Sequence, residues 1–171
     1  MALWRRLGLD PAVVPSEKPA QMNISPRRIG AVTRGEALSL LAGVSVGRIV
    51  FTENAMPAVR PASHLVVLDE IIARSHDGSA IVPVVDSNPD GEWSTGSERE
   101  TVIAYEADDI DINSRLGWSV VVTGPATPIT DPGEIARYAT VLTPWAFAGE
   151  GQLIRIHAGI VTGYRLFDHS G

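Results

Sequence analysis

The stretch Gly47–Gly78 reads GRIVFTENAMPAVRPASHLVVLDEIIARSHDG, and it decides the fold of the chain. Three apolar runs rich in β-branched residues are separated by two short turn signals, Glu53–Ala55 and Leu68–Asp69. Such runs joined by short turns are typical of antiparallel strands that follow one another in sequence. The middle run contains Pro61, which has no amide hydrogen to donate to a neighbouring strand. We therefore expect Pro61 at an edge, at a bulge or where something other than a strand approaches.

Two arginines lie on adjacent runs of this stretch, near serine and histidine side chains. Arg60 lies on the middle run before Ser63 and His64, and Arg74 lies on the third run. Guanidinium groups make charge-assisted, often bidentate hydrogen bonds to phosphate, so this pattern is compatible with an anion site. The alternative is surface ion pairing, which contributes little stability. The nearby acidic residues are Glu53, Asp69 and Glu70.

Composition limits the class of protein. The 171 residues are 44% hydrophobic and 20% charged, which fits one soluble globular domain. The net charge of −6 argues against a general nucleic-acid-binding protein, because neutralising phosphates requires a basic face. The absence of cysteine excludes disulfides and thiolate chemistry, and the four histidines show no metal-ligand spacing, so we predict no metal. We find neither a membrane-spanning run nor a secretory signal, and we expect a cytoplasmic protein.

Two capping patterns mark the expected helices. Residues 1–32 contain four prolines and no sustained periodicity, so we predict an N-terminal extension, partly disordered, followed by the folded domain at 33–171. Thr33 and Glu36 form a capping box that opens a helix over 33–42. Asp131 precedes a proline, and this pattern opens a second helix over 131–142.

Further strands follow the first three. Alternating or apolar runs predict strands at about residues 101–107, 117–129, 152–157 and 160–166, and residues 86–100 are read as a surface loop. The acidic run 108–113 lacks the spacing of a calcium loop and is interpreted as a solvated turn. Strands dominate without β–α–β alternation, so the sequence favours a small antiparallel barrel.

The sequence resembles the flavin-nucleotide-binding branch of the pyridoxamine 5′-phosphate oxidase family. The order and spacing of several motifs between about residues 25 and 167 carry the resemblance. These motifs are Gly47–Phe51, Met56–Pro61 with Ser63 and His64, Arg74–Ser79, Tyr105–Asp111, Gly117–Gly124, Pro144–Trp145 and Ile154–His157. The resemblance implies a mainly β fold, a split antiparallel β-barrel with short flanking helices. It also implies a homodimer that holds FMN at the interface between its subunits.

The resemblance further implies which positions hold the phosphate end of the cofactor. Arg60 would lie beside the ribityl chain or the phosphate. Arg74, Ser75 and Ser79 would bind the phosphate itself. One departure is that Ala80 and Ile81 stand where family members often have a cation after the Gly-Ser turn. With one cation fewer, the phosphate is bound more weakly, which leaves a deazaflavin cofactor or FAD as alternatives to FMN.

The flavin ring and the substrate are assigned in the same way. Three residues, Pro61, Ala62 and Ser63, would present backbone along the isoalloxazine edge. Trp118 and Ser119 would approach from the other subunit, and His64 and Trp145 would border the substrate space. Each has a structural alternative: His64 as a strand histidine with satisfied hydrogen bonds, and the two tryptophans as core or interface anchors.

The implied function is that of an FMN-binding protein, an oxidoreductase of the pyridoxamine phosphate oxidase type acting on a small organic substrate. Two alternatives remain open at this point. One is a non-catalytic flavin or deazaflavin binding or sensing module, and the other is a barrel that has lost its cofactor. The sequence names no substrate and no catalytic residue, because this fold hosts several chemistries.

Overall fold

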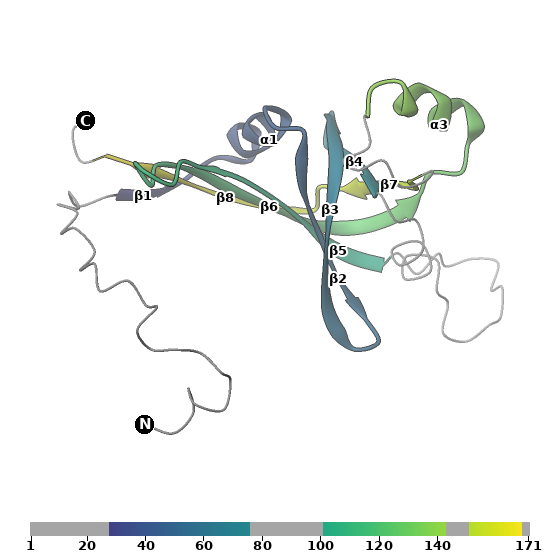
Figure 1. Ribbon diagram of the computed structural model, residues 1–171, viewed down its shortest axis with the longest axis horizontal. Coiled ribbons are helices and arrows are strands. Elements are labelled where there is room, and N and C mark those ends of the chain that lie inside the picture. The colour runs from purple at the N-terminus through teal and green to yellow at the C-terminus, as the bar shows by residue number, and fades with distance from the viewer. Residues whose placement is uncertain (1–27, 76–100, 143–150, 169–171) are drawn as a thin grey trace, which may run out of the picture.

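The computed structural model describes residues 28–75, 101–142 and 151–168. This part of the chain forms eight strands and two helices (Figure 1). The strands are β1 (Arg28–Ala31), β2 (Val46–Glu53), β3 (Met56–Val67), β4 (Glu70–Ser75), β5 (Thr101–Ile110), β6 (Gly117–Pro128), β7 (Leu153–His157) and β8 (Ile160–Phe167). The helices are α1 (Arg34–Ala42) and α3 (Pro132–Ala139).

Six of the strands close into an antiparallel barrel. Their order is β6-β5-β2-β3-β4-β7, and the pairing of β7 with β6 completes the ring. Strands β8 and β1 continue the sheet outward from β6, and the long β2–β3 hairpin projects beyond the barrel (Figure 1). The predicted fold class, a mainly β split barrel with two flanking helices, is confirmed.

Strand β6 changes partners at Gly124 and Pro125. Residues 117–123 pair with β8, whereas residues 126–128 pair with β7, and the pairing with β5 runs unbroken past this point. A Cβ at Gly124 would lie 1.8 Å from the carbonyl oxygen of His157, so the turn between β7 and β8 can cross β6 only over a glycine. The strand predicted at about residues 117–129 therefore exchanges one neighbouring strand for another at this point.

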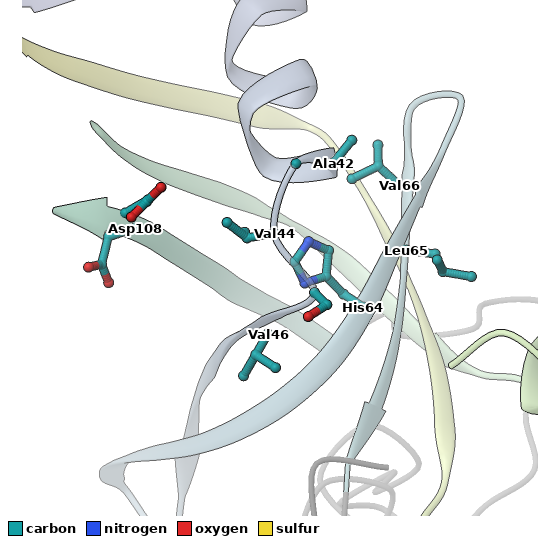
Figure 2. Close-up of a pocket in the computed structure, with 10 residues that line it drawn as sticks. Ala42, Val44, Val46, His64, Leu65, Val66 and Asp108 are labelled. Atoms are coloured by element: carbon teal, nitrogen blue, oxygen red, sulfur yellow. The ribbon is translucent and has the colours of Figure 1, made fainter. Parts of the chain in front are cut away.

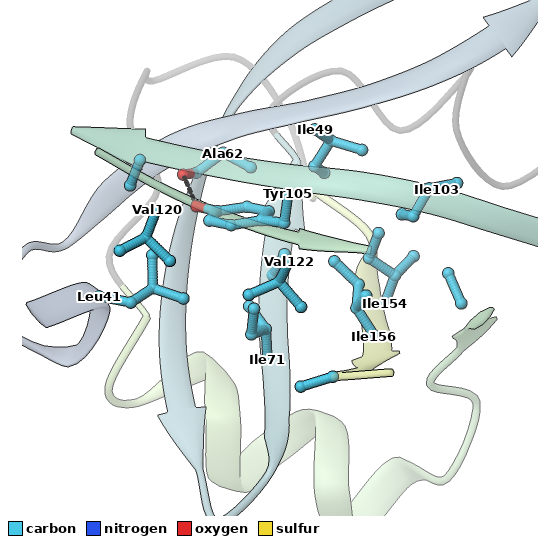
Figure 3. Close-up of a cluster of buried hydrophobic side chains, with 14 of the residues drawn as sticks. Leu41, Ile49, Ala62, Ile71, Ile103, Tyr105, Val120, Val122, Ile154 and Ile156 are labelled. Atoms are coloured by element: carbon cyan, nitrogen blue, oxygen red, sulfur yellow. Dashed lines mark hydrogen bonds between the residues drawn. The ribbon is translucent and has the colours of Figure 1, made fainter. Parts of the chain in front are cut away.

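In the described part of the chain, buried apolar side chains form two clusters. The larger lies inside the barrel, and Figure 3 shows Tyr105 at its centre among Leu41, Val120 and Val122. The smaller lies between α3 and the outer face of β4 and β7 and contains Ile72, Ile129, Tyr138, Leu142 and Leu153. Because side chains alternate along a strand, Ile71 and Ala73 of β4 point into the barrel, while Ile72 and Arg74 point toward α3.

Both predicted caps are present. The Thr33 hydroxyl accepts a hydrogen bond from the amide of Glu36 at 3.3 Å, and the Asp131 carboxylate accepts one from Glu134 at 2.8 Å. Helix α3 ends three residues earlier than the predicted 142, although the amide of Leu142 still donates to the carbonyl of Tyr138. Strand β1, which pairs with β8, lies within the segment that the sequence assigned to an extension.

We predict that replacing Gly124 by Ala destabilises the protein by about 3 kcal/mol or more, since neither backbone can move away without breaking the β6 pairing. The matched control is Gly35→Ala, because a Cβ at Gly35 of α1 meets nothing within 4 Å. Alanine there is expected to stabilise by about 0.5 kcal/mol through helix propensity. Urea denaturation measures both, and equal effects would show that the crossing at Gly124 imposes no constraint.

Candidate functional site

A cavity of about 600 Å³ lies where α1 ends and β2 begins (Figure 2). Figure 2 shows His64 in the middle of the lining side chains, with Asp108 on one side and Leu65 and Val66 on the other. The complete lining is Ala42, Gly43, Val44, Ser45, Val46, His64, Leu65, Val66, Asp108 and Asp109. A largely apolar cavity with a few polar groups is the usual form of a small-molecule site.

Hydrogen bonds fix the ring of His64 on both sides. Its Nε2 lies 2.9 Å from the carbonyl oxygen of Leu41, and its Nδ1 lies 2.8 Å from the hydroxyl of Tyr105. The same hydroxyl lies 3.0 Å from the carbonyl oxygen of Ala62 (Figure 3). Gly47 leaves room for this arrangement, because a Cβ there would stand 2.7 Å from the Tyr105 hydroxyl. The structural alternative given for His64, a strand histidine with satisfied hydrogen bonds, describes this geometry.

The hydrogen-bond partners of His64 determine which of its ring nitrogens carries the proton. A backbone carbonyl can only accept, so Nε2 carries the hydrogen that reaches Leu41, and in the neutral ring Nδ1 accepts from Tyr105. Burial lowers the pKa of His64, although the hydrogen bond to Leu41 opposes this shift. Burial also raises the pKa of Tyr105. Both rings are therefore neutral near pH 7, and they brace α1, β3 and β5 against one another beside the cavity.

Arg74 lies on the outer face of the barrel, directly across from Ser63. Its Nη1 donates to the carbonyl oxygen of Leu142 at 3.0 Å. Its Nε is buried and has no hydrogen-bond partner in the part of the chain that the structure describes. A buried donor without an acceptor is costly, so this atom is a place where an external acceptor gains binding energy.

Arg60 does not share that face. It stands three positions before Ser63 on an uninterrupted strand, so its side chain leaves β3 on the opposite side from the Ser63–Arg74 row. Its guanidinium lies 5.8 Å from the ring centre of Phe51 and 3.5 Å from the carboxylate of Glu53. The contact with Glu53 is the ion pair given above as the alternative for Arg60, and a role of Arg60 beside the ribityl chain or the phosphate stays a prediction.

The other assigned positions are placed as follows. Trp118 points inward and is buried in the barrel core, as its structural alternative stated, whereas Ser119 points to the outer face between Asp108 and Tyr164. Ala62 is buried, and Pro61 lies where β3 has β2 on one side and, among the described residues, no strand on the other. Ser75 ends β4, while Ser79 and Trp145 lie outside the described residues.

Sequence reasoning missed two features of the site. Tyr105, which braces His64, entered only as part of a matching motif. The signal that it faces inward was the alternation with Ile103 and Ala107, all three of which are buried. The second feature is an ion-pair cluster in which Nη1 of Arg48 lies 2.9 Å from Glu106 and 2.8 Å from Asp108. Spacing along β5 places both carboxylates on one face.

No metal site and no membrane-crossing helix are seen in the described ranges. Within residues 28–75, 101–142 and 151–168, no three His, Asp or Glu side chains gather as metal ligands would. In the same ranges, no helix has the length and apolar character needed to cross a bilayer.

A six-stranded antiparallel barrel of this topology, with two flanking helices, defines a class, the split-barrel proteins. The sequence model of the family described as pyridoxamine 5′-phosphate oxidase matches residues 33–164, and the chain belongs to that family.

The chain is also similar to individual proteins and solved structures. The uncharacterized protein Rv0080 of Mycobacterium tuberculosis is 43% identical over 142 residues, which cover 83% of this chain and 88% of that protein. A crystal structure of a candidate pyridoxamine 5′-phosphate oxidase of Corynebacterium glutamicum has a TM-score of 0.62 and 25% identity, covering 82% of this chain and 99% of that one. The FAD-binding protein of Mycobacterium smegmatis has a TM-score of 0.55 and 24% identity, covering 81% and 97%.

We predict that His64 makes stability depend on pH. Its folded pKa lies below its ordinary value of about 6.5, so the unfolded chain binds this proton more readily. The stabilisation is fully present above about pH 6.5 and is lost as the pH falls toward the folded pKa.

Urea denaturation between about pH 8 and about pH 5.5 measures this dependence, and His64→Gln is expected to remove the His64 component. The control is His157→Gln, which changes an exposed histidine on β7 and is expected to keep the dependence. A His64→Gln profile parallel to that of the wild type would contradict the assignment.

Proposed function

We propose that this protein binds a flavin nucleotide, FMN, and acts as an oxidoreductase on a small organic substrate. The observation that carries the proposal is the buried Nε of Arg74, which has no hydrogen-bond partner among the described residues and lies on the strand that the family resemblance assigns to the cofactor phosphate. The M. smegmatis protein, which shares the fold, is described as binding FAD. Membership of the pyridoxamine 5′-phosphate oxidase family supports a flavin cofactor for this chain.

The described residues fit the phosphate end of such a cofactor. Arg74 is partly buried, and its Nη1 donates to the carbonyl of Leu142, which orients the guanidinium, while its Nε meets no acceptor within residues 28–75, 101–142 and 151–168. A phosphate oxygen at that edge would receive a charge-assisted hydrogen bond. Ser63 lies directly across from Arg74 in the same row of the sheet. We therefore assign phosphate binding to Arg74, with Ser75 and Ser79 as further proposed donors.

Arg60 belongs to a different surface in this proposal. Its guanidinium contacts Phe51 and Glu53 of the β2–β3 hairpin. The absence of a cation at Ala80 and Ile81 leaves Arg74 as the main positive charge that we assign to the phosphate. The alternative ligands are a deazaflavin and FAD, which has a pyrophosphate in place of the terminal phosphate of FMN.

The cofactor is proposed to lie in a seam between two copies of the chain. The outer faces of β3, β5 and β8 expose apolar side chains, among them Val59 at 50%, Val102 at 63% and Ile160 at 65%. Register places Val59, Val50, Ala104, Thr123 and Ile160 in one row across the sheet. An exposed row that is apolar except for Thr123 favours a partner surface, and we propose that a second copy covers it with matching side chains.

Bound flavin supplies hydride or electron transfer, and the protein supplies binding and orientation. The cavity beside His64 is where we propose that the substrate lies. His64 uses both ring nitrogens for Leu41 and Tyr105, so its role there is to shape the wall. Reduction of bound flavin by a nicotinamide donor, followed by reoxidation by an acceptor, distinguishes an oxidoreductase from a binding or sensing module.

We predict that Arg74→Ala weakens FMN binding by about one to two orders of magnitude, because one charge-assisted contact contributes roughly 1.5 to 3 kcal/mol. Riboflavin lacks the phosphate, so its affinity is expected to stay nearly unchanged. Quenching of flavin fluorescence measures both affinities.

The matched control is Arg60→Ala, which removes an arginine from the opposite face of β3 and is expected to affect FMN less. Equal losses for FMN and riboflavin would mean that Arg74 supports the fold. Unchanged FMN affinity in Arg74→Ala would mean that the phosphate binds elsewhere.

We also predict that Ile160→Glu converts a dimer into an 18.2 kDa monomer, because it places a charge in the apolar row. Leu68→Glu is the control, since Leu68 is 92% exposed at the tip of the β3–β4 turn, away from that row. Sedimentation at micromolar concentration separates the two states. A wild-type protein that sediments as a monomer would contradict the proposed seam.

A further inference from the structure

We propose that the cavity beside His64 accepts a small organic cation or a neutral molecule and rejects phosphorylated and other anionic compounds. This inference rests on the proposed function, since it names the class of substrate for the same cavity. It follows from the charges around the cavity, from its apolar walls and from the helix end that forms one side of it.

The side chains that line the cavity favour a ligand that is mostly apolar. Val44, Val46, Leu65 and Val66 line the cavity together with Ala42 and the backbone at Gly43. His64 is only 2% exposed, and both of its ring nitrogens already have partners inside the protein. The wall therefore offers an aromatic edge and aliphatic side chains but no cationic donor.

The charged groups beside the cavity are mainly carboxylates. Asp108 is bound by Arg48, which also binds Glu106, so a single guanidinium is shared by two acidic side chains. Asp109 lines the cavity as well, and it pairs with no cation in the described part of the chain. One positive charge against three negative charges leaves two negative charges in excess at this side of the cavity.

The carboxyl-terminal end of α1 adds to the negative potential in the cavity. Ala42 closes the helix and Gly43 caps it, and both line the cavity. The carboxyl-terminal end of a helix carries a partial negative charge that favours cations and disfavours anions. Lining groups and helix end thus act in one direction, whereas Arg74, proposed to bind the cofactor phosphate, lies on the outer face near α3.

The experiment compares ligands that share a ring and differ in charge. Benzylamine, benzyl alcohol and benzoate are titrated into the full-length protein with FMN present, and methyl signals of Val44, Val46 and Val66 report binding in the cavity by NMR. We expect benzylamine to bind about fivefold more tightly than benzyl alcohol, because a partly exposed ion pair contributes about that factor. Benzoate is expected to bind most weakly, and pyridoxamine is expected to bind more tightly than its 5′-phosphate.

Two variants locate the effect. Asp109→Asn is expected to bring the affinity for benzylamine closer to that for benzyl alcohol, because it removes one of the two excess negative charges. Glu36→Gln removes a carboxylate from the first turn of α1, at the opposite end of the helix, and is expected to leave the order unchanged. The inference is overturned if benzoate or pyridoxamine 5′-phosphate binds as tightly as the amines. It is also overturned if none of the ligands shifts the methyl signals of Val44, Val46 and Val66 while flavin is bound.

The flavin spectrum separates this inference from the proposed function. A protein that takes up no flavin contradicts the proposed function, and the titration is then carried out on the flavin-free chain. Preference for the amine in that chain keeps the charge selectivity of the cavity. Loss of the preference with flavin bound refutes the inference alone.

Discussion

The change of partners along β6 is the constraint on which the rest of the structure depends. One continuous strand pairs with β8 over its first half and with β7 over its last residues, while β5 stays paired along its length. This exchange closes six strands into a barrel and leaves β8 and β1 as an outward sheet. It is possible because Gly124 lets the His157 carbonyl pass where a side chain would stand.

Closure of the barrel in turn places the groups that matter for binding. It brings β3 and β5 close enough for Tyr105 to reach both His64 and the Ala62 carbonyl, and His64 then reaches the end of α1. One buried series of hydrogen bonds thus positions the wall of the cavity. On the other side of the sheet, α3 covers β4 and β7, and the carbonyl of Leu142, three residues after the helix, accepts a hydrogen bond from Arg74. The two proposals therefore place the substrate and the cofactor phosphate on different sides of the sheet.

The sequence predicted the elements that local signals encode. The caps at Thr33 and Asp131 and the strands on either side of Leu68–Asp69 stand in contiguous residues, and they were recognised. Strand β1 was not, because four residues of this kind become a strand only by pairing with distant β8. The sequence also contained enough information to place Arg60 and Arg74 on opposite faces of the sheet, but this inference was not made. A two-residue turn at Leu68–Asp69 sets Ser63 against Arg74, and counting back three positions turns Arg60 to the other face.

The central claim is that Arg74 binds the phosphate of a flavin nucleotide on the outer face of the barrel. A crystal structure of the protein grown with saturating FMN tests it most directly. The account predicts the phosphate within hydrogen-bond distance of the Arg74 Nε, with the Leu142 carbonyl still bound to Nη1. A phosphate bound on the Arg60 side of β3, or an Arg74 side chain without contact to a bound flavin, would contradict the account.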